Sequence, residues 1–448
     1  LILYGPPGVG KTTAARLVLD EAKKLPFTAF GENAPFVECD GTTLRWDSRD
    51  MTNPLIGSVH DPIYQGAQRD LADEGIPEPK PGLVTDAHGG VLFIDEIGEL
   101  DPMMLNKLLK VLEDKRVHFE SAYYDEDAPG IPEYIRKLFK EGAPADFILI
   151  GATTRDPSEI NPAIRSRCAE VFFDPLQPEH VIEIVNHAAE KLKVHLDDGV
   201  ARLISEYTME GRKAVSLLAD AYGLAVYEKG SADAPVITLD LMKKTAMASR
   251  LSPWYDKVAS DVPKVGHIYG LGVAGYWGST VEIEATAFPA REEGKGTIHF
   301  NETAGSMAKD SVATAASVVR ELTDKVLSDY DLHVNIVGGG NIDGPSAGSA
   351  ITAAIISAVE KIPLRQDYAV TGEISLSGEV KPVGGVYEKA FGARQAGMKG
   401  ILIPEGNRSD IEEGHLGLTV TPVKNIREVL DKMLVRTPKT AGEEPLPV

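Results

Sequence analysis

The sequence predicts a multidomain α/β protein with three successive units, and three patterns along the chain indicate it. Over residues 1–175, short apolar runs rich in Val, Ile and Leu alternate with amphipathic stretches, which is typical of buried parallel strands joined by helices. Residues 176–252 show only helical periodicity and predict a small all-α unit. A segment with Pro, Ser and Asp at 253–265 indicates a linker. Strands and helices alternate again over 266–436, an α+β unit, and a tail occupies 437–448.

The composition excludes several kinds of protein. The chain has 448 residues, 43% of them hydrophobic and 25% charged, which suits packed domains rather than disorder. Its formal net charge of -21 argues against a nucleic-acid groove, because neutralising phosphates takes clustered Lys and Arg. No run approaches the roughly 18 consecutive apolar residues that span a bilayer.

The cysteines indicate the cellular compartment, and the first residue indicates whether an N-terminal segment is missing. Cys39 and Cys168 are too far apart for a metal motif and too few for a disulfide framework, so we expect a reducing, cytoplasmic setting. The chain begins at Leu1 inside a predicted strand. We therefore expect an N-terminal segment to be missing, and with it any signal peptide or membrane anchor.

Residues 5–13, GPPGVGKTT, follow an apolar run, precede a helical pattern and fit the spacing G-x-x-x-x-G-K-[ST]. Glycines let backbone N–H groups approach phosphate oxygens, and the following helix adds partial positive charge. Lys11 is expected to reach the β- and γ-phosphates and Thr12 to ligate Mg²⁺. The alternative is a chance glycine turn. The predicted ATP–Mg²⁺ loop consists of Gly5, Pro6, Pro7, Gly8, Val9, Gly10, Lys11, Thr12 and Thr13.

Two acidic residues follow the apolar run in VLFIDEIGEL. Asp95 closes the predicted strand and can hold Mg²⁺, while Glu96 can orient and deprotonate the attacking water. Alone such a pair is a weak signal. Together with Lys11 it predicts ATP hydrolysis.

Threonines and arginines downstream add to this interpretation. Thr153 and Thr154 end another apolar run, and either can contact the γ-phosphate or the water, or simply cap a turn. Arg165 and Arg167 in NPAIRSRC are either solvated charges or an arginine finger offered to a neighbouring subunit. The finger requires an oligomer.

In this order, GPPGVGKTT, FIDEIGEL, GATTRDP and AIRSRC resemble the motifs of the AAA+ ATPases. The resemblance implies a homo-oligomeric ring, usually of six subunits, with ATP between them and Arg167 as the finger. It also implies a nucleotide-sensing arginine in the helical unit. Arg212, in EGRKAVSLL, matches that motif, although a solvated arginine at a helix start is the alternative.

Ser346, in NIDGPSAGSA, precedes a strongly apolar helical pattern and is either a helix cap or a nucleophile. Neighbouring glycines allow backbone N–H groups to point at an oxyanion. A nucleophile needs a base, and a lysine can serve where burial lowers its pKa. Lys389 and Lys381 are both candidates. The histidines sit in or beside strand-like stretches, which favours packed or surface roles: His267, His299 and His333.

DGPSAGSA and YAVTGEISLSGEVKPVGGVYEKAFGARQAGMKGILIP closely resemble the proteolytic domain of the Lon proteases, over roughly Gly266 to Met433. The resemblance implies that Ser346 is the nucleophile and that Lys389, rather than Lys381, is the general base. Ser346 is then expected both to cap its helix and to attack.

The same resemblance covers two further residues. Thr371, in VTGEIS, matches the threonine whose hydroxyl helps to orient the lysine, and Asp343 matches an acidic residue that gates the site in some relatives. The segments around the Asp95 strand resemble the LonB type, in particular the sporulation-associated Lon-like proteases of Gram-positive bacteria. Relatives in that group can carry an N-terminal membrane segment.

Family resemblance also suggests a loop that lines the pore of the ring and grips substrate. Leu55 and Ile56 match its aromatic–aliphatic pair in position, but the aromatic residue is absent. Tyr64 is an alternative, and each of these residues is equally a candidate for a buried loop anchor.

Together these features predict an ATP-dependent serine endopeptidase that pulls unfolded polypeptide through an oligomeric ring and cuts it with a Ser–Lys dyad. Two alternatives remain open. One is a Lon-like peptidase that works without ATP on a structural ring. The other is a remodelling ATPase without proteolysis.

Overall fold

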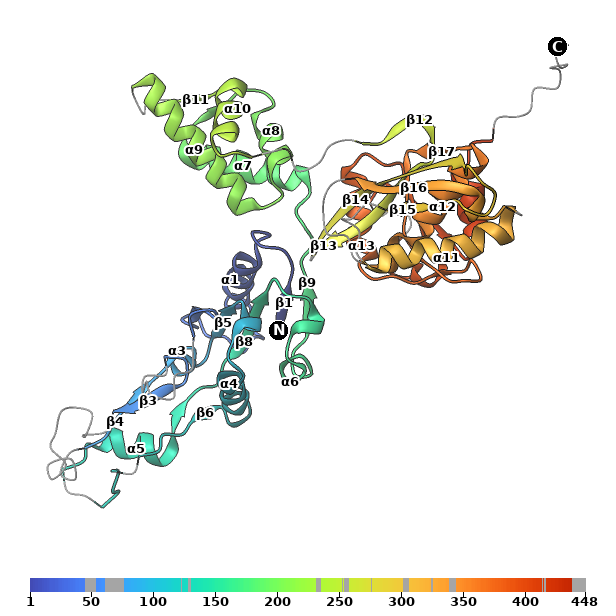
Figure 1. Cartoon of the computed structure of the whole chain (residues 1–448). Helices are drawn as coiled ribbons and strands as arrows, with labels where there is room; N and C mark the ends of the chain where they lie inside the picture. The colour runs from blue at the N-terminus through green and yellow to red at the C-terminus, as the bar shows by residue number, and fades with distance from the viewer. Residues whose placement is uncertain are drawn as a thin grey trace, which may run out of the picture. The chain divides into compact units, whose positions relative to one another are not determined.

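The computed structural model describes residues 1–44, 54–60, 76–121, 123–127, 130–230, 235–251, 253, 258–274, 276–300, 306–323, 325–337, 344–412, 414 and 416–436. The chain divides into two compact units, Leu1–Ser252 and Pro253–Val448. Figure 1 shows both units and labels many of their helices and strands. Tyr64 and Asp343, which the sequence singled out, lie outside the described residues.

The first unit contains a five-stranded sheet in the order β2-β5-β8-β1-β9, with every pairing parallel. Its inner strands are apolar along their length, because helices and loops cover both faces. A parallel sheet gathers the carboxyl ends of its strands at one edge, so the residues that follow them meet there. The strands are β1 Ile2–Tyr4, β2 Phe36–Asp40, β5 Val91–Asp95, β8 Ile148–Thr153 and β9 Glu170–Phe172.

Helices and two short antiparallel strand pairs, β3–β4 and β6–β7, accompany this sheet. Helix α4 begins where Asp101 accepts a hydrogen bond from the Met103 amide and Pro102 occupies the first turn, a favourable start for a helix. The further elements are α1 Lys11–Ala22, β3 Gly57–His60, β4 Glu78–Pro81, α3 Leu83–Asp86, η2 Ile97–Glu99, α4 Pro102–Asp114, β6 Arg116–Val117, α5 Glu133–Glu141, β7 Ala143–Pro144, η3 Pro157–Glu159 and α6 Pro162–Arg165.

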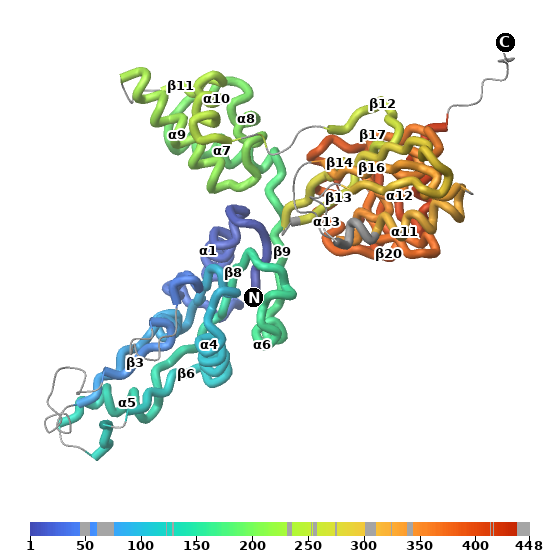
Figure 2. Tube along the Cα trace, viewed as in Figure 1, coloured from blue at the N-terminus to red at the C-terminus, as the bar shows by residue number. Residues whose placement is uncertain are grey.

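The rest of this unit is helical, as the periodicity predicts. Four helices pack together around an apolar cluster that includes Val185, Ile204, Leu218 and Met242, and Figure 2 shows their trace in green. Two short parallel strands, β10 and β11, accompany them. The elements are α7 Pro178–Leu192, β10 His195–Leu196, α8 Val200–Tyr207, α9 Gly211–Lys229, β11 Val236–Ile237 and α10 Leu239–Ala248.

The second unit contains a seven-stranded mixed sheet in the order β15-β16-β14-β13-β18-β21-β22. Strands β13, β14 and β16 run antiparallel, while β18 is parallel to both β13 and β21. The strands of this unit are β12 Ser260–Val265, β13 His267–Ala274, β14 Trp277–Pro289, β15 Ile298–Phe300, β16 Tyr330–Val337, β17 Pro363–Gln366, β18 Tyr368–Val370, β19 Glu373–Ile374, β20 Val380–Lys381, β21 Gly400–Pro404 and β22 Thr419–Val423.

Helices cover both faces of this sheet. On one face, the core joins α12 to Ile268 and Ile283, and Gly270 of β13 lies against Ala350. Residues alternate between faces along a strand, so Val273 points to the other face, where it meets Gly385 at the start of α13. The helices are α11 Ser306–Thr323, η4 Leu327–Asp329, η5 Pro345–Ala347, α12 Gly348–Glu360, α13 Val386–Gln395, η6 Glu405–Asn407 and α14 Ile426–Met433.

The structure differs from the sequence prediction at the expected linker. Residues 260–265 of that segment form strand β12, which pairs antiparallel with β17. The prediction failed because Pro263 and the polar residues suggest a loop, whereas this strand pairs with β17 alone and is largely exposed. Within the part of the chain that the structure describes, no helix has the length and apolar character needed to cross a membrane.

Helix α13 lies unusually close to the β13–β14 hairpin. A Cβ atom on Gly278 would lie 1.7 Å from the Glu388 carbonyl oxygen, and one on Gly392 would lie 2.3 Å from the Gly278 carbonyl carbon. Real Cβ atoms do not approach so closely, so the helix can occupy this place only because both positions are glycine.

We predict that Gly278→Ala destabilises the second unit, because the added methyl group must push α13 away from the hairpin. The expected loss is about 2 kcal/mol, measured by urea unfolding followed by fluorescence. Gly384→Ala is the matched control, since a Cβ there would meet nothing within 4 Å. Equal stability of Gly278→Ala and the control would contradict the close packing.

Candidate functional site

The loop between β1 and α1 binds the side chain of Lys11 through its own backbone carbonyls. Gly8 and Gly10 adopt positive φ angles of 72° and 97°, and α1 begins directly at Lys11. The Lys11 side chain is buried, and its Nζ donates hydrogen bonds to the carbonyls of Gly5 at 2.7 Å and Pro6 at 2.9 Å. Burial lowers the pKa of this ammonium, although the carboxylates of Glu96 and Asp95 act in the opposite direction.

The two carboxylates stand at the carboxyl end of β5. Asp95 ends the strand, and Glu96 follows it in a left-handed conformation with φ 49°. The Glu96 carboxylate accepts hydrogen bonds from the Thr154 amide at 3.1 Å and from the Thr154 hydroxyl at 3.1 and 3.2 Å. Since β5 and β8 are neighbours, Thr154, which directly follows β8, holds the predicted catalytic glutamate in place.

The alternative role of Thr153 and Thr154, as caps of the turn at Asp156, is not what the structure shows. Asp156 itself caps η3, because its side chain accepts a hydrogen bond from the Ser158 amide. Thr153 is fully buried and its hydroxyl accepts from the Arg155 amide. Thr154 therefore serves Glu96, a contact that the sequence does not reveal.

Both candidate finger arginines have acidic partners within the chain. Arg165 donates to Glu170 at 2.7 Å, and this ion pair also lies beside Tyr4. Arg167 donates to Glu113 on α4 at 3.1 Å and to the Ala163 carbonyl at 2.9 Å. These are exposed ion pairs of the kind that cost little to break.

Arg212 lies in the first turn of α9, and the start of this helix contacts the nucleotide loop. The Gly211 amide donates a hydrogen bond to the Gly8 carbonyl at 3.0 Å. Arg212 is close enough that its charge contributes to lowering the pKa of Lys11, after the larger effect of burial. The structure therefore places Arg212 beside the loop. Gly211, which makes the contact, has no sequence signal of its own.

The candidate pore residues differ from each other. Leu55 is fully buried, and its carbonyl accepts a hydrogen bond from the Val84 amide, whereas Ile56 is half-buried. The prediction that Leu55 grips substrate is wrong in this chain, because its side chain has no exposed surface. Leu55 is the loop anchor that the alternative interpretation describes.

Ser346 occupies the middle of the short turn η5, ahead of α12. The prediction that Ser346 caps α12 is wrong, because the cap position is Ala347 and no side chain bonds there. Pro345 starts a helical turn early and the chain continues directly into α12, which leaves no extended residue for a cap. The serine hydroxyl is thus not committed to capping.

The Ser346 backbone is held by the end of β18. Its carbonyl accepts hydrogen bonds from the Gly372 amide at 2.9 Å and from the Thr371 hydroxyl at 3.3 Å. Thr371 is fully buried, and the bond that the structure gives its hydroxyl goes to the serine backbone. Gly372 is a supporting residue that sequence reasoning missed, although it adjoins Thr371 in VTGEIS.

Lys389 lies on α13 and is 2% exposed. Burial lowers the pKa of its ammonium to about 8, and the charge of Glu388 opposes this only in part. Lys381, the competing lysine, is exposed and ion-paired with Glu379 at 2.6 Å. Of the two candidates, only Lys389 has the dry surroundings that a neutral lysine requires.

The sheet topology brings Ser346 and Lys389 to one edge. Strands β13 and β18 are parallel, so their carboxyl ends lie together. Ser346 is tied to the residues after β18, and α13 carries Lys389 against the carboxyl end of β13. Helices α12 and α13 cover opposite faces of the sheet, so Ser346, just ahead of α12, and Lys389, on α13, belong to helical segments on its two sides.

Comparisons with known proteins agree with this architecture. Residues 1–176 match the family described as "ATPase family associated with various cellular activities (AAA)", and residues 249–436 match "Lon protease (S16) C-terminal proteolytic domain". The chain is 48% identical over 453 residues to "Lon protease 2" of Bacillus subtilis, which covers 98% of this chain and 81% of that protein.

Archaeal proteins are similar at lower identity. The "Archaeal Lon protease" of Archaeoglobus fulgidus is 30% identical over 457 residues, covering 94% of this chain and 70% of that protein. The protein of the same description from Thermococcus kodakarensis is 29% identical over 448 residues, covering 91% and 67%. With an AAA ATPase domain followed by an S16 proteolytic domain, the chain belongs to the Lon protease family, whose members are ATP-dependent serine proteases.

Proposed function

We propose that Ser346 and Lys389 form the dyad with which this protease cuts polypeptide. The observation that carries the proposal is the burial of Lys389, whose pKa falls to about 8, so that a neutral amine is readily available near physiological pH. An amine that buried, beside the edge of the sheet where Ser346 lies, has the properties of a general base.

In the proposed mechanism, the neutral Lys389 amine takes the proton of the Ser346 hydroxyl as Oγ attacks the scissile carbonyl. The lysine then gives this proton to the leaving amine, and water attacks the acyl-enzyme by the same route. The amino end of α12 follows Ser346 directly and stabilises the negative charge that develops on the carbonyl oxygen. Thr371 and Gly372 fix the serine backbone during these steps.

ATP is proposed to bind where the loop of residues 5–13 meets the carboxyl edge of the first sheet. Lys11 contacts its phosphates, and Glu96 activates the attacking water once Thr154 releases its carboxylate. The Thr12 hydroxyl and the Asp95 carboxylate are oxygen ligands of the type that Mg²⁺ prefers, so the residues present fit this ion. Magnesium bound there would neutralise phosphate charge.

The family and the positions of two arginines support a proposal for the assembled protein. We infer a hexameric cytoplasmic ring in which Arg167 leaves Glu113 to reach the ATP of a neighbouring subunit, while Arg212 senses nucleotide in its own subunit. Hydrolysis then moves unfolded polypeptide through the ring toward the Ser346 sites.

Degradation of an unfolded fluorescent protein tests both halves together. We expect the chain to degrade it with ATP and Mg²⁺, and Ser346→Ala to show no cleavage above background while its ATP hydrolysis remains within about twofold. Cleavage by the unaltered chain without ATP would assign the ring a structural role. Cleavage by Ser346→Ala would remove the serine from the mechanism.

The variant Lys389→Arg tests the base. Arginine keeps the positive charge but cannot lose its proton in a protein, so peptide hydrolysis is expected to fall at least about 100-fold with ATP hydrolysis retained. Lys381→Arg is the matched control and should cut normally. A fully active Lys389→Arg protein would exclude Lys389 as the base.

Lys389→Met tests the burial of the amine through stability. In the unaltered chain the folded pKa is about 8 against an ordinary value of 10.5, so the unfolded state binds more protons between these values and stability rises with pH. Methionine removes this penalty. The variant should therefore be the more stable protein below pH 8, and its advantage should disappear as the pH approaches 10.5.

Thermal unfolding of both proteins at several pH values measures this difference. Peptidase activity of the unaltered chain, measured on a short peptide, should rise as the pH passes through about 8 and the amine becomes neutral. A stability difference that does not vary with pH would show that Lys389 titrates normally.

A further inference from the structure

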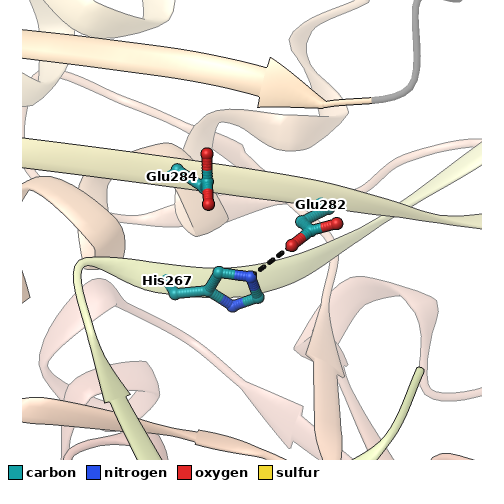
Figure 3. Close-up of side chains that lie close together, drawn as sticks. All are labelled: His267, Glu282 and Glu284. Carbon is teal, nitrogen blue, oxygen red and sulfur yellow. Dashed lines mark hydrogen bonds and ion pairs between the residues drawn. The ribbon is translucent and has the colours of Figure 1, made fainter.

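A histidine and two glutamates form a cluster on the β13–β14 hairpin, away from both sites described above. His267 of β13 pairs across the sheet with Glu284 of β14, and Glu282 pairs with Tyr269. Side chains two residues apart on a strand share a face, so His267, Glu282 and Glu284 all lie on one face of the sheet, as Figure 3 shows.

The three side chains present their ligand atoms to one another. His267 Nε2 lies 2.5 Å from Glu282 Oε1, and one ligand atom from each residue lies within 4.8 Å of the others. Ligands bonded to one ion at about 2.1 Å stand about 3.4 Å apart in a tetrahedral arrangement. A small rotation of the long glutamate side chains is enough to reach that geometry.

His267 is also buried in a way that its other contacts do not explain. Its side chain is 6% exposed, and its Nδ1 has no hydrogen-bond partner within the described part of the chain. The contact that orients the ring is the one with Glu282 (Figure 3), apart from an edge-on contact with Tyr269. An imidazole nitrogen with two carboxylates around it, neither of them fully buried, is a donor set that a divalent ion can use.

The ion pairs that the structure describes for the cluster involve no lysine or arginine. Glu284 accepts a hydrogen bond from Asn335 at 3.3 Å, and among the described residues neither glutamate is ion-paired with a lysine or arginine. Two carboxylates this close repel each other. A divalent cation between them would attract both and outweigh that repulsion.

We propose that His267, Glu282 and Glu284 bind one divalent transition-metal ion, of which Zn²⁺ is the representative. An imidazole nitrogen combined with carboxylate oxygens suits Zn²⁺, whereas Ca²⁺ and Mg²⁺ favour oxygen ligands throughout. Water completes the fourth position. The ion would join β13 to β14 and so stiffen the hairpin on which α13 rests.

The proposed ion is structural rather than catalytic. Val273, where β13 meets the start of α13, is six residues from His267, which is about 20 Å along a strand at roughly 3.3 Å per residue. The inference is therefore independent of the Ser346–Lys389 dyad. It is tested without measuring proteolysis.

The test is a titration of the full chain with Zn²⁺ after metal removal by a chelator, in nucleotide-free buffer. The double variant Glu282→Gln/Glu284→Gln retains the size of both side chains but removes both charges. Glu292→Gln/Glu293→Gln is the matched control, because it removes two exposed carboxylates from the same unit. The cysteines and other histidines are common to all three proteins, so their contribution cancels.

Calorimetry should show that the unaltered chain and the control each bind one equivalent of Zn²⁺ more than the cluster variant does. Alternatively, the variant should bind this equivalent at least tenfold more weakly than they do. Zn²⁺ should also raise the unfolding temperature of those two proteins but not of the variant, while Mg²⁺ at the same concentration should not distinguish them. Identical isotherms for the variant and the control would overturn the proposal.

A second measurement serves if the double variant does not fold, as judged by circular dichroism. Glu284→Gln alone alters only the member of the cluster that is not bonded to His267. Co²⁺ bound to the unaltered chain should give visible absorption bands of a four-coordinate site, and these should change in Glu284→Gln. An unchanged spectrum would exclude Glu284 as a ligand and refute the three-residue site.

Discussion

The dry environment of one ammonium group is the constraint on which the proteolytic unit depends. The base role proposed for Lys389 requires that α13 hold its side chain away from water. Helix α13 can lie there only because Gly278 and Gly392 leave room for the backbones to touch. The same burial costs stability, since the charged form of the lysine is disfavoured in its pocket. The stability of the fold and the proposed catalytic role of Lys389 thus make opposite demands on this residue.

In the first unit, hydrogen bonds rather than burial hold the proposed catalytic side chain. The role proposed for Glu96, activation of the attacking water, requires its carboxylate to be held in a defined position. Thr154 holds it with both its amide and its hydroxyl. The parallel order of β5 and β8 makes this possible, because it places the ends of the two strands side by side.

Much of this arrangement is predictable from the sequence, and the rest depends on contacts between distant residues. The helices α4, α10 and α12 and the strands ending at Asp95 and Thr153 follow from apolar periodicity, and the motifs name Ser346, Lys389 and Lys11. The failures share one cause. Burial of Leu55, the absence of a cap at Ser346 and the pairing of β12 with β17 all depend on tertiary packing, which local pattern does not contain.

The hydrogen bond from Gly211 to Gly8 connects the helical part of the first unit to the glycine-rich loop. It joins the loop that is proposed to bind phosphate to the first residue of α9, a helix of 19 residues. Such a helix is about 28 Å long at 1.5 Å per residue. A rotation of about 5° at its first turn therefore displaces its far end by about 2.5 Å. If a phosphate bound at the loop moved Gly8 by a fraction of an ångström, this lever would enlarge the movement to the scale of a side chain.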